Sequence, residues 1–203
     1  MLVNRTINGS TKRYIEYLTA DFYPVDVTSR KDMYFLDGGL TYTGAPTTNI
    51  TGLLHLQNES VSIVADGVYI GEKVVSNTGV VTLTTAASTV HVGYKYRGLI
   101  QLLPLDGQSH DGGGALGKVK RIGRTLLRLL SSLEFKYGTK ITQLDVKKLT
   151  DGSGITPTND FFTGDIVVNM SMGYDLTAMP YIVQDNPYPL IVLAIGPDTE
   201  INS

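Results

Sequence analysis

Turn signals that recur at short intervals between β-branched runs constrain the fold of this chain more than any other feature. Asp37-Gly38-Gly39, Asp66-Gly67 and Asn77-Thr78-Gly79 interrupt a stretch rich in Val, Ile, Thr and Tyr that runs from Leu36 to Leu105. Asp-Gly supplies the positive φ angles of a tight hairpin turn, and β-branched side chains fit a pleated, half-buried surface. The pattern predicts an antiparallel hairpin unit over residues 60–96, with turns at Asp66-Gly67 and Asn77-Thr78-Gly79.

The whole chain is predicted to be mainly β, an antiparallel hairpin-built small barrel or sandwich followed by a second β-rich section. With 203 residues it can bury one sizeable core or two small ones. Glycine-rich turn signals cluster between residues 106 and 117. We therefore expect an antiparallel β domain over 1–105, a flexible glycine-rich loop over 106–117 and a β-rich section over 118–203. The last section can pack on the first as one domain.

Two alternatives compete for the leucine-rich stretch that follows this loop. Its apolar side chains recur close to helical spacing, with Lys and Arg largely on the opposite face, which favours a helix. In a strand, Arg124 and Arg128 would share a face with Leu126, a poor pattern for a half-buried sheet. Gly123 weakens the helix, because an interior glycine costs roughly 1 kcal/mol relative to Ala. The residues alone favour a helix slightly.

Composition excludes several classes of protein. The chain contains no cysteine, which excludes a disulfide framework and thiolate-ligated zinc. A formal net charge of -2 argues against a protein that coats nucleic acid all over. No run of 18 apolar residues is present, so we predict no membrane partner.

One stretch imitates a phosphate-binding loop. Residues 112–119 read Gly-Gly-Gly-Ala-Leu-Gly-Lys-Val, close to the pattern G-x-x-x-x-G-K-[ST]. Val119 replaces the hydroxyl that would bind Mg²⁺, and polar residues rather than an apolar strand precede the loop. We predict that the chain binds no nucleotide and needs no cofactor.

The nucleophiles and histidines indicate no catalytic or metal site. His55, His91 and His110 form no ligand pair at helical or hairpin spacing. The chain lacks a G-x-S-x-G elbow, and Ser131-Ser132 lie far in sequence from any histidine. Two carboxylates can meet in space as in a glycosidase, but no pair is singled out. We predict no catalytic, cofactor-binding or metal-binding residues and a protein that is not an enzyme.

A basic cluster is the strongest physical indication of a partner. Five positive charges fall within eleven residues with no acid among them: Lys118, Lys120, Arg121, Arg124 and Arg128. Such a cluster is typical of a surface that faces phosphates or an acidic partner. The alternative, which we favour, is the solvated face of an element whose leucines are buried, with the Lys and Arg stems covering apolar surface.

Several short motifs resemble the C-terminal part of tail proteins from short-tailed bacteriophages. The motifs are NRTINGSTKRYIE at 4–16, FLD at 35–37, TGLLHL at 51–56, VSIVADG at 61–67, VHVGYKY at 90–96, KRI at 120–122 and DNPYPL at 185–190. Over most of its length the chain is similar to the tail-tube nozzle proteins (tail tubular protein B type) of phages and prophages. Those proteins are usually much longer, so we expect this chain to correspond to their C-terminal part.

The resemblance implies a β-rich virion structural protein of the phage tail, made in the host cytoplasm. Such a protein assembles as a homo-oligomer with other virion tail proteins around a DNA passage, and its contact with DNA is weak and non-specific at most. The resemblance brings no catalytic residues. It also favours a strand over residues 118–130, and we predict a strand there on that basis.

A β-sandwich binding module that recognises carbohydrate on a host surface is the alternative function. Tyrosines supply candidate stacking platforms for sugar rings, although the chain contains no Trp. The candidates are Tyr14, Tyr17, Tyr42, Tyr69, Tyr94 and Tyr96.

Overall fold

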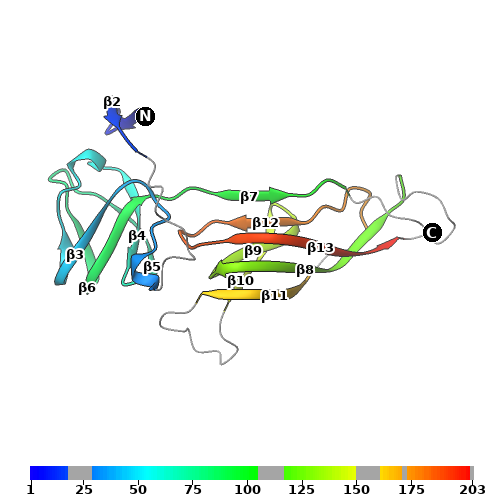
Figure 1. Ribbon diagram of the computed structural model, residues 1–203. Helices are drawn as coiled ribbons and strands as arrows, with labels where there is room; N and C mark the ends of the chain where they lie inside the picture. Colours follow the sequence, from blue (N-terminus) through cyan, green and yellow to red (C-terminus); the bar gives the residue numbers. More distant parts are fainter. Residues whose placement is uncertain (18–28, 105–116, 150–160, 171–172, 202–203) are drawn as a thin grey trace. The chain divides into compact units, whose positions relative to one another are not determined.

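The computed structural model describes residues 1–17, 29–104, 117–149, 161–170 and 173–201 (Figure 1). The predicted fold class is confirmed, because the described residues form antiparallel sheets that carry nearly all of the secondary structure. No sheet among them closes into a barrel, so the sandwich fits. Two units divide the chain between Tyr96 and Arg97, and residues 186–188 return to unit 1. Of the loop expected over 106–117, residues 106–116 lie outside the described ranges.

Unit 1 contains two separate sheets. The first is the hairpin of β1 (Leu2–Ile7) and β2 (Ser10–Ile15). The second has four antiparallel strands in the spatial order β3 (Asp37–Ile50), β6 (Val81–Tyr94), β4 (Ser60–Ala65) and β5 (Val68–Val74). Two short 3-10 turns, η1 (Arg30–Asp32) and η2 (Leu54–Leu56), complete the unit. The fully buried side chains of its core include Ile50, Leu53, Leu56, Val61, Ile63, Val90 and Val92.

The predicted turn at Asp66-Gly67 is confirmed. Both residues have positive φ, 46° and 80°, as a two-residue turn between β4 and β5 requires. The chain also turns at Asn77-Thr78-Gly79, but the prediction of a hairpin there is wrong, because β4 lies between β5 and β6. Backbone bonds from Ser76 to Val80 and from Leu53 to Gly79 hold this turn, and it leads the chain to the other edge of β4.

The expected turn at Asp37-Gly38-Gly39 is also wrong, because these residues begin strand β3. The register of β3 on β6 shifts between Asp37 and Leu40. A Cβ on Gly39 would overlap the Val92 carbonyl oxygen and lie 2.9 Å from the Cα of Gly93. The glycine therefore permits close approach of two strands, and does not mark a reversal of the chain.

Unit 2 is a sandwich of two antiparallel sheets. One has the order β10 (Gln143–Lys148), β9 (Glu134–Lys140), β12 (Tyr181–Gln184) and β7 (Gly98–Gln101). The other has the order β11 (Phe162–Asn169), β8 (Lys120–Ser132) and β13 (Ile191–Ile201). Their shared core combines Ile122, Leu127 and Leu129 of β8 and Val168 of β11 with Phe135 of β9 and Ile182 of β12.

Strand β8 confirms the strand predicted from the resemblance, and the helix favoured by the residues alone is wrong. The register with β13 shifts around Gly123, so β8 carries one extra residue there. Ile122 is buried before this bulge, and Thr125, Leu127 and Leu129 are buried after it. The inward-facing positions therefore change from even to odd residue numbers at Gly123. This change places the buried apolar residues near helical spacing although the segment is a strand.

Thr125 offers a test of this packing. It is fully buried on β8 between Val168 of β11 and Pro197 of β13, and its hydroxyl has no hydrogen-bond partner among the described residues. Thr125→Val is expected to raise the free energy of unfolding by about 1 kcal/mol, because it removes an unsatisfied buried hydroxyl. Urea unfolding measures the change. Thr163→Val is the matched control and should destabilise, since the Thr163 hydroxyl accepts the Ser131 N–H at 3.0 Å.

Candidate functional site

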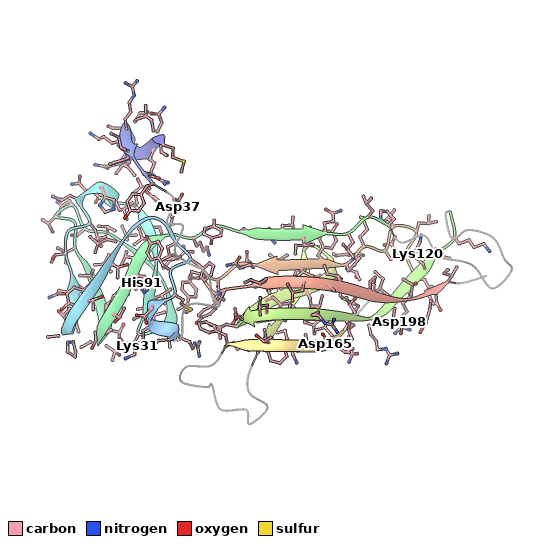
Figure 2. The ribbon with its side chains drawn as sticks, viewed as in Figure 1. Lys31, Asp37, His91, Lys120, Asp165 and Asp198 are labelled. Atoms are coloured by element: carbon pink, nitrogen blue, oxygen red, sulfur yellow. The ribbon has the colours of Figure 1, made fainter. Side chains whose placement is uncertain are left out.

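The outer face of the β11–β8–β13 sheet pairs the exposed arginines of β8 with carboxylates from both neighbouring strands. Arg128 donates two hydrogen bonds to Asp165 of β11, at 2.7 and 2.8 Å. Arg124 donates to Asp198 of β13 at 3.1 Å. Figure 2 shows the two acids on the strands that flank β8. The guanidinium of Arg128 holds the pKa of Asp165 below its usual range. Each arginine thus has an acidic partner that lies far from it in the sequence.

The lysines of the basic cluster are less exposed than its arginines. Lys120 is 2% exposed, and its backbone forms a two-way bridge with Asp175. Lys118 is half-buried, whereas Arg121 is exposed. The five charges therefore do not gather on one surface. This arrangement fits the alternative of a solvated strand face over buried leucines, and not a continuous phosphate-binding surface.

An apolar pair lies between the two ion pairs. Leu126 of β8 and Val167 of β11 are cross-strand partners, and their side chains are 41% and 51% exposed. The side chains of both ion pairs are also exposed, and exposed ion pairs contribute little to stability. The outer face of the sheet is therefore mixed in character, with charge neutralised within the face.

The histidines that the structure describes act as hydrogen-bonding residues of unit 1. The His55 ring lies 3.1 Å from the Gly38 carbonyl oxygen, and the His55 carbonyl accepts the Tyr14 hydroxyl at 3.3 Å. His91 is buried and bonds elsewhere, and His110 lies outside the described residues. No group of three or more His, Asp or Glu side chains in the described ranges is placed to hold a metal ion.

His91 connects η1 to the sheet through both ring nitrogens. Nε2 lies 2.7 Å from the Lys31 carbonyl oxygen, and Nδ1 lies 2.8 Å from the Thr41 hydroxyl. The Tyr34 ring packs edge-on against the imidazole. Figure 2 labels His91 and Lys31. A carbonyl only accepts, so Nε2 carries the hydrogen, and Nδ1 accepts from Thr41 in the neutral ring. Protonation makes Nδ1 a donor as well, so the Thr41 hydroxyl would have to turn and accept from it.

Acidification is therefore expected to destabilise unit 1. Burial lowers the pKa of His91, opposed by the bond to Lys31 and by the charge of Asp32. The folded pKa lies below the unfolded value of about 6.5, so the stability that neutral His91 supplies is complete above that value. This contribution to stability is lost as the pH falls from about 6.5 through the pKa of His91 in the folded protein. Urea unfolding between about pH 7.5 and pH 5 measures the loss. His91→Gln should flatten this dependence, with His55→Gln as the control for removal of an imidazole.

The tyrosines proposed as sugar platforms serve different parts of the fold. The hydroxyl of Tyr14 bonds to His55, that of Tyr42 bonds to Ala45, and the ring of Tyr94 lies under the Arg5 guanidinium. Of the six, only Tyr17 and Tyr96 have exposed side chains, at 86% and 46%. Of residues 112–119, which resemble a phosphate-binding loop, the structure describes Gly117, Lys118 and Val119, and the others lie outside the described residues.

A charged cluster around Arg5 joins the β1–β2 hairpin to the four-stranded sheet. Arg5 donates to both carboxylate oxygens of Glu16, at 2.7 and 2.8 Å, and contacts Asp37 at 2.9 Å. Its guanidinium also lies 5.6 Å from the centre of the Tyr94 ring. Hydrogen bonding to Glu16 raises the pKa of Arg5 and lowers that of Glu16. Our sequence reading missed this cluster, although Asn8-Gly9 is the turn signal that indicates the hairpin.

Residues 185–188 make contacts within each of the two units. Within unit 2, Asp185 binds Lys136 at 2.7 Å and Arg97 at 3.2 Å. Within unit 1, the Tyr188 hydroxyl accepts the backbone N–H of Tyr69 at 2.8 Å. That bond satisfies a donor on the outer edge strand of the sheet.

A scan against protein-family models and a search of curated proteins find no match to this chain. The described part of the chain contains no helix that is both long and apolar enough to cross a membrane.

Proposed function

We propose that this protein is a structural component of a bacteriophage tail nozzle, and that it acts by assembling with other tail proteins, and with copies of itself, around a DNA passage. The observation that supports this proposal is the role of the motif residues. These residues are distributed over the fold and hold it together.

Four of the motifs illustrate this role. Arg5 and Glu16 belong to the first motif, and they anchor the hairpin to Asp37 of the second. His91 connects β6 to η1 and β3. Asp185, which belongs to the last motif, forms ion pairs with Arg97 and Lys136 of unit 2. A structural protein needs such residues, because they maintain the surfaces through which it assembles.

The pairing of the arginines on β8 also fits a DNA passage. Each phosphate that a protein neutralises adds affinity, which would slow movement of DNA through the assembly. Arg124 and Arg128 already have carboxylate partners, so their attraction for phosphate is reduced. A wall of this kind contacts DNA without retaining it.

The isolated chain is therefore expected to bind duplex DNA weakly at physiological salt. Binding at low salt should fall steeply as salt rises, and replacing Arg121, Arg124 and Arg128 with Ser should flatten that dependence. Fluorescence anisotropy of a labelled duplex measures both. The triple variant should remain folded, because all three side chains are exposed. Unfolding of this variant would instead identify the arginine stems as packing groups, and tight sequence-specific binding would contradict the proposal.

Virion composition tests the proposal directly. Particles are purified from an induced culture of the source strain and analysed by quantitative mass spectrometry. We expect the chain, or a longer protein that contains it, at several copies per particle and in the tail fraction after heads and tails are separated. Its absence from purified particles that carry the other tail proteins would overturn the assignment.

A carbohydrate-binding module on a host-recognition protein remains the second candidate, and a glycan array separates the two. A nozzle component should bind no sugar. Binding to a defined glycan that is lost in Tyr17→Ala or Tyr96→Ala would favour the alternative, because these two tyrosines have the exposed rings that stacking requires.

A further inference from the structure

The β1–β2 hairpin is a separate element that is docked on unit 1 and not woven into its sheet. Its two strands pair with each other over six residue pairs, and no described strand continues their ladder. In Figure 1 the hairpin stands outside the four-stranded sheet of unit 1. Detaching it would break no backbone ladder of the four-stranded sheet.

Docking depends on a small set of complementary contacts. Ile7 enters the buried core cluster at 4% exposure. Arg5 binds Asp37 at 2.9 Å, and the Asn8 N–H donates to the Glu59 carboxylate at 2.8 Å. The Tyr14 hydroxyl donates to the His55 carbonyl oxygen. Figure 2 places Asp37 where the hairpin meets the rest of the unit. The receiving surface is thus an apolar site flanked by two carboxylates, matched to this hairpin.

The hairpin needs that surface, because an isolated two-stranded hairpin is marginally stable in water. The surface needs the hairpin, because Ile7 covers apolar residues that would otherwise face water. Residues 18–28 connect the two, and a chain of that length can span up to about 35 Å. The same contacts are available between two molecules as within one.

We infer that the β1–β2 hairpin is an exchangeable arm that docks on the equivalent surface of a second copy of this chain. The contacts with Asp37, Glu59 and the core are the same in the closed and in the exchanged form. The connection within one chain favours the closed form in dilute solution, and high local concentration favours exchange. All the contacts lie within unit 1, so exchange does not depend on the tail function proposed above.

Cross-linking of full-length chains tests exchange. The natural chain has no cysteine, so a short bis-maleimide reacts only at introduced thiols. One chain carries Asn8→Cys, which keeps the backbone N–H that Glu59 accepts, and a second chain with a different affinity tag carries Ser60→Cys, at the exposed neighbour of Glu59. The two are mixed, unfolded and refolded together, and then cross-linked. A product containing both tags reports a hairpin docked on another copy, and its share should rise about tenfold for a tenfold rise in protein concentration.

Two further variants make the outcome decisive. The chain carrying both Asn8→Cys and Ser60→Cys should cross-link within itself in dilute solution, and failure to do so would overturn the docking itself. Asp37→Arg in the Ser60→Cys chain should reduce the mixed product severalfold, since it removes the partner of Arg5 while Asp37 is itself half exposed. Exchange is overturned if the double variant links only within one chain at every concentration, or if Asp37→Arg leaves the mixed product unchanged.

Discussion

Gly39→Ala is expected to destabilise unit 1 by on the order of 4 kcal/mol or more, and to prevent folding if unit 1 has no larger reserve. The added methyl group would overlap the Val92 carbonyl oxygen and lie 2.5 Å from the Tyr34 hydroxyl. A side chain can rotate away, but the carbonyl belongs to the β6 backbone at a point where β6 lies between β3 and β4. Relief therefore requires the strands to separate, which breaks their shared hydrogen bonds.

The free energy of unfolding in urea, or the yield of folded protein, measures this effect. Gly196→Ala is the matched control, because it adds the same methyl group to β13 with its nearest contact at 3.9 Å from Leu126. That control should be neutral or slightly stabilising, since it only restricts the unfolded chain. Equal stability of Gly39→Ala and Gly196→Ala would contradict the close approach of β3 and β6.

Local turn chemistry predicted one hairpin correctly and the neighbours of the next strand incorrectly. Asp66-Gly67 requires positive φ at two adjacent residues, and few local structures other than a tight hairpin provide it. The turn at Asn77-Thr78-Gly79 carries a similar signal, but it leads to a strand on the far side of β4. The position of β6 depends on which edge of β4 is free, and β5 already occupies one edge. The alternation of apolar and polar residues within a strand does not specify which neighbour the strand pairs with.

The same limit applies to the charged residues. Arg124 and Arg128 appear unpaired in the sequence, because their partners lie on β13 and β11. Those partners become evident only when the register of three strands is known. Strand β8 itself was misread from its residues for a related reason, since the bulge at Gly123 shifts the phase of burial within one strand. A prediction from hydrophobic periodicity assumes that the same set of alternating positions faces the core along the whole element.

Gly67→Val is expected to lower the free energy of unfolding by about 3 kcal/mol or more, from two separable causes. Gly67 has φ of 80°, a conformation that costs a β-branched residue about 1–2 kcal/mol. A Cβ there would also lie 2.8 Å from the carbonyl carbon and the Cβ of Arg30. Because η1 is held against β6 through His91, the Arg30 backbone cannot move aside freely.

The turn at Asn8-Gly9 separates these two causes within the same molecule. Asn8 and Gly9 have φ of 48° and 71°, close to the 46° and 80° of Asp66 and Gly67, yet a Cβ on Gly9 meets nothing within 4 Å. Gly9→Val should therefore show the conformational cost alone, about 1–2 kcal/mol. The difference between the two variants measures the contact of the β4–β5 turn with η1. Equal losses would mean that η1 does not restrain this turn, and an unchanged melting temperature for Gly67→Val would contradict the turn geometry itself.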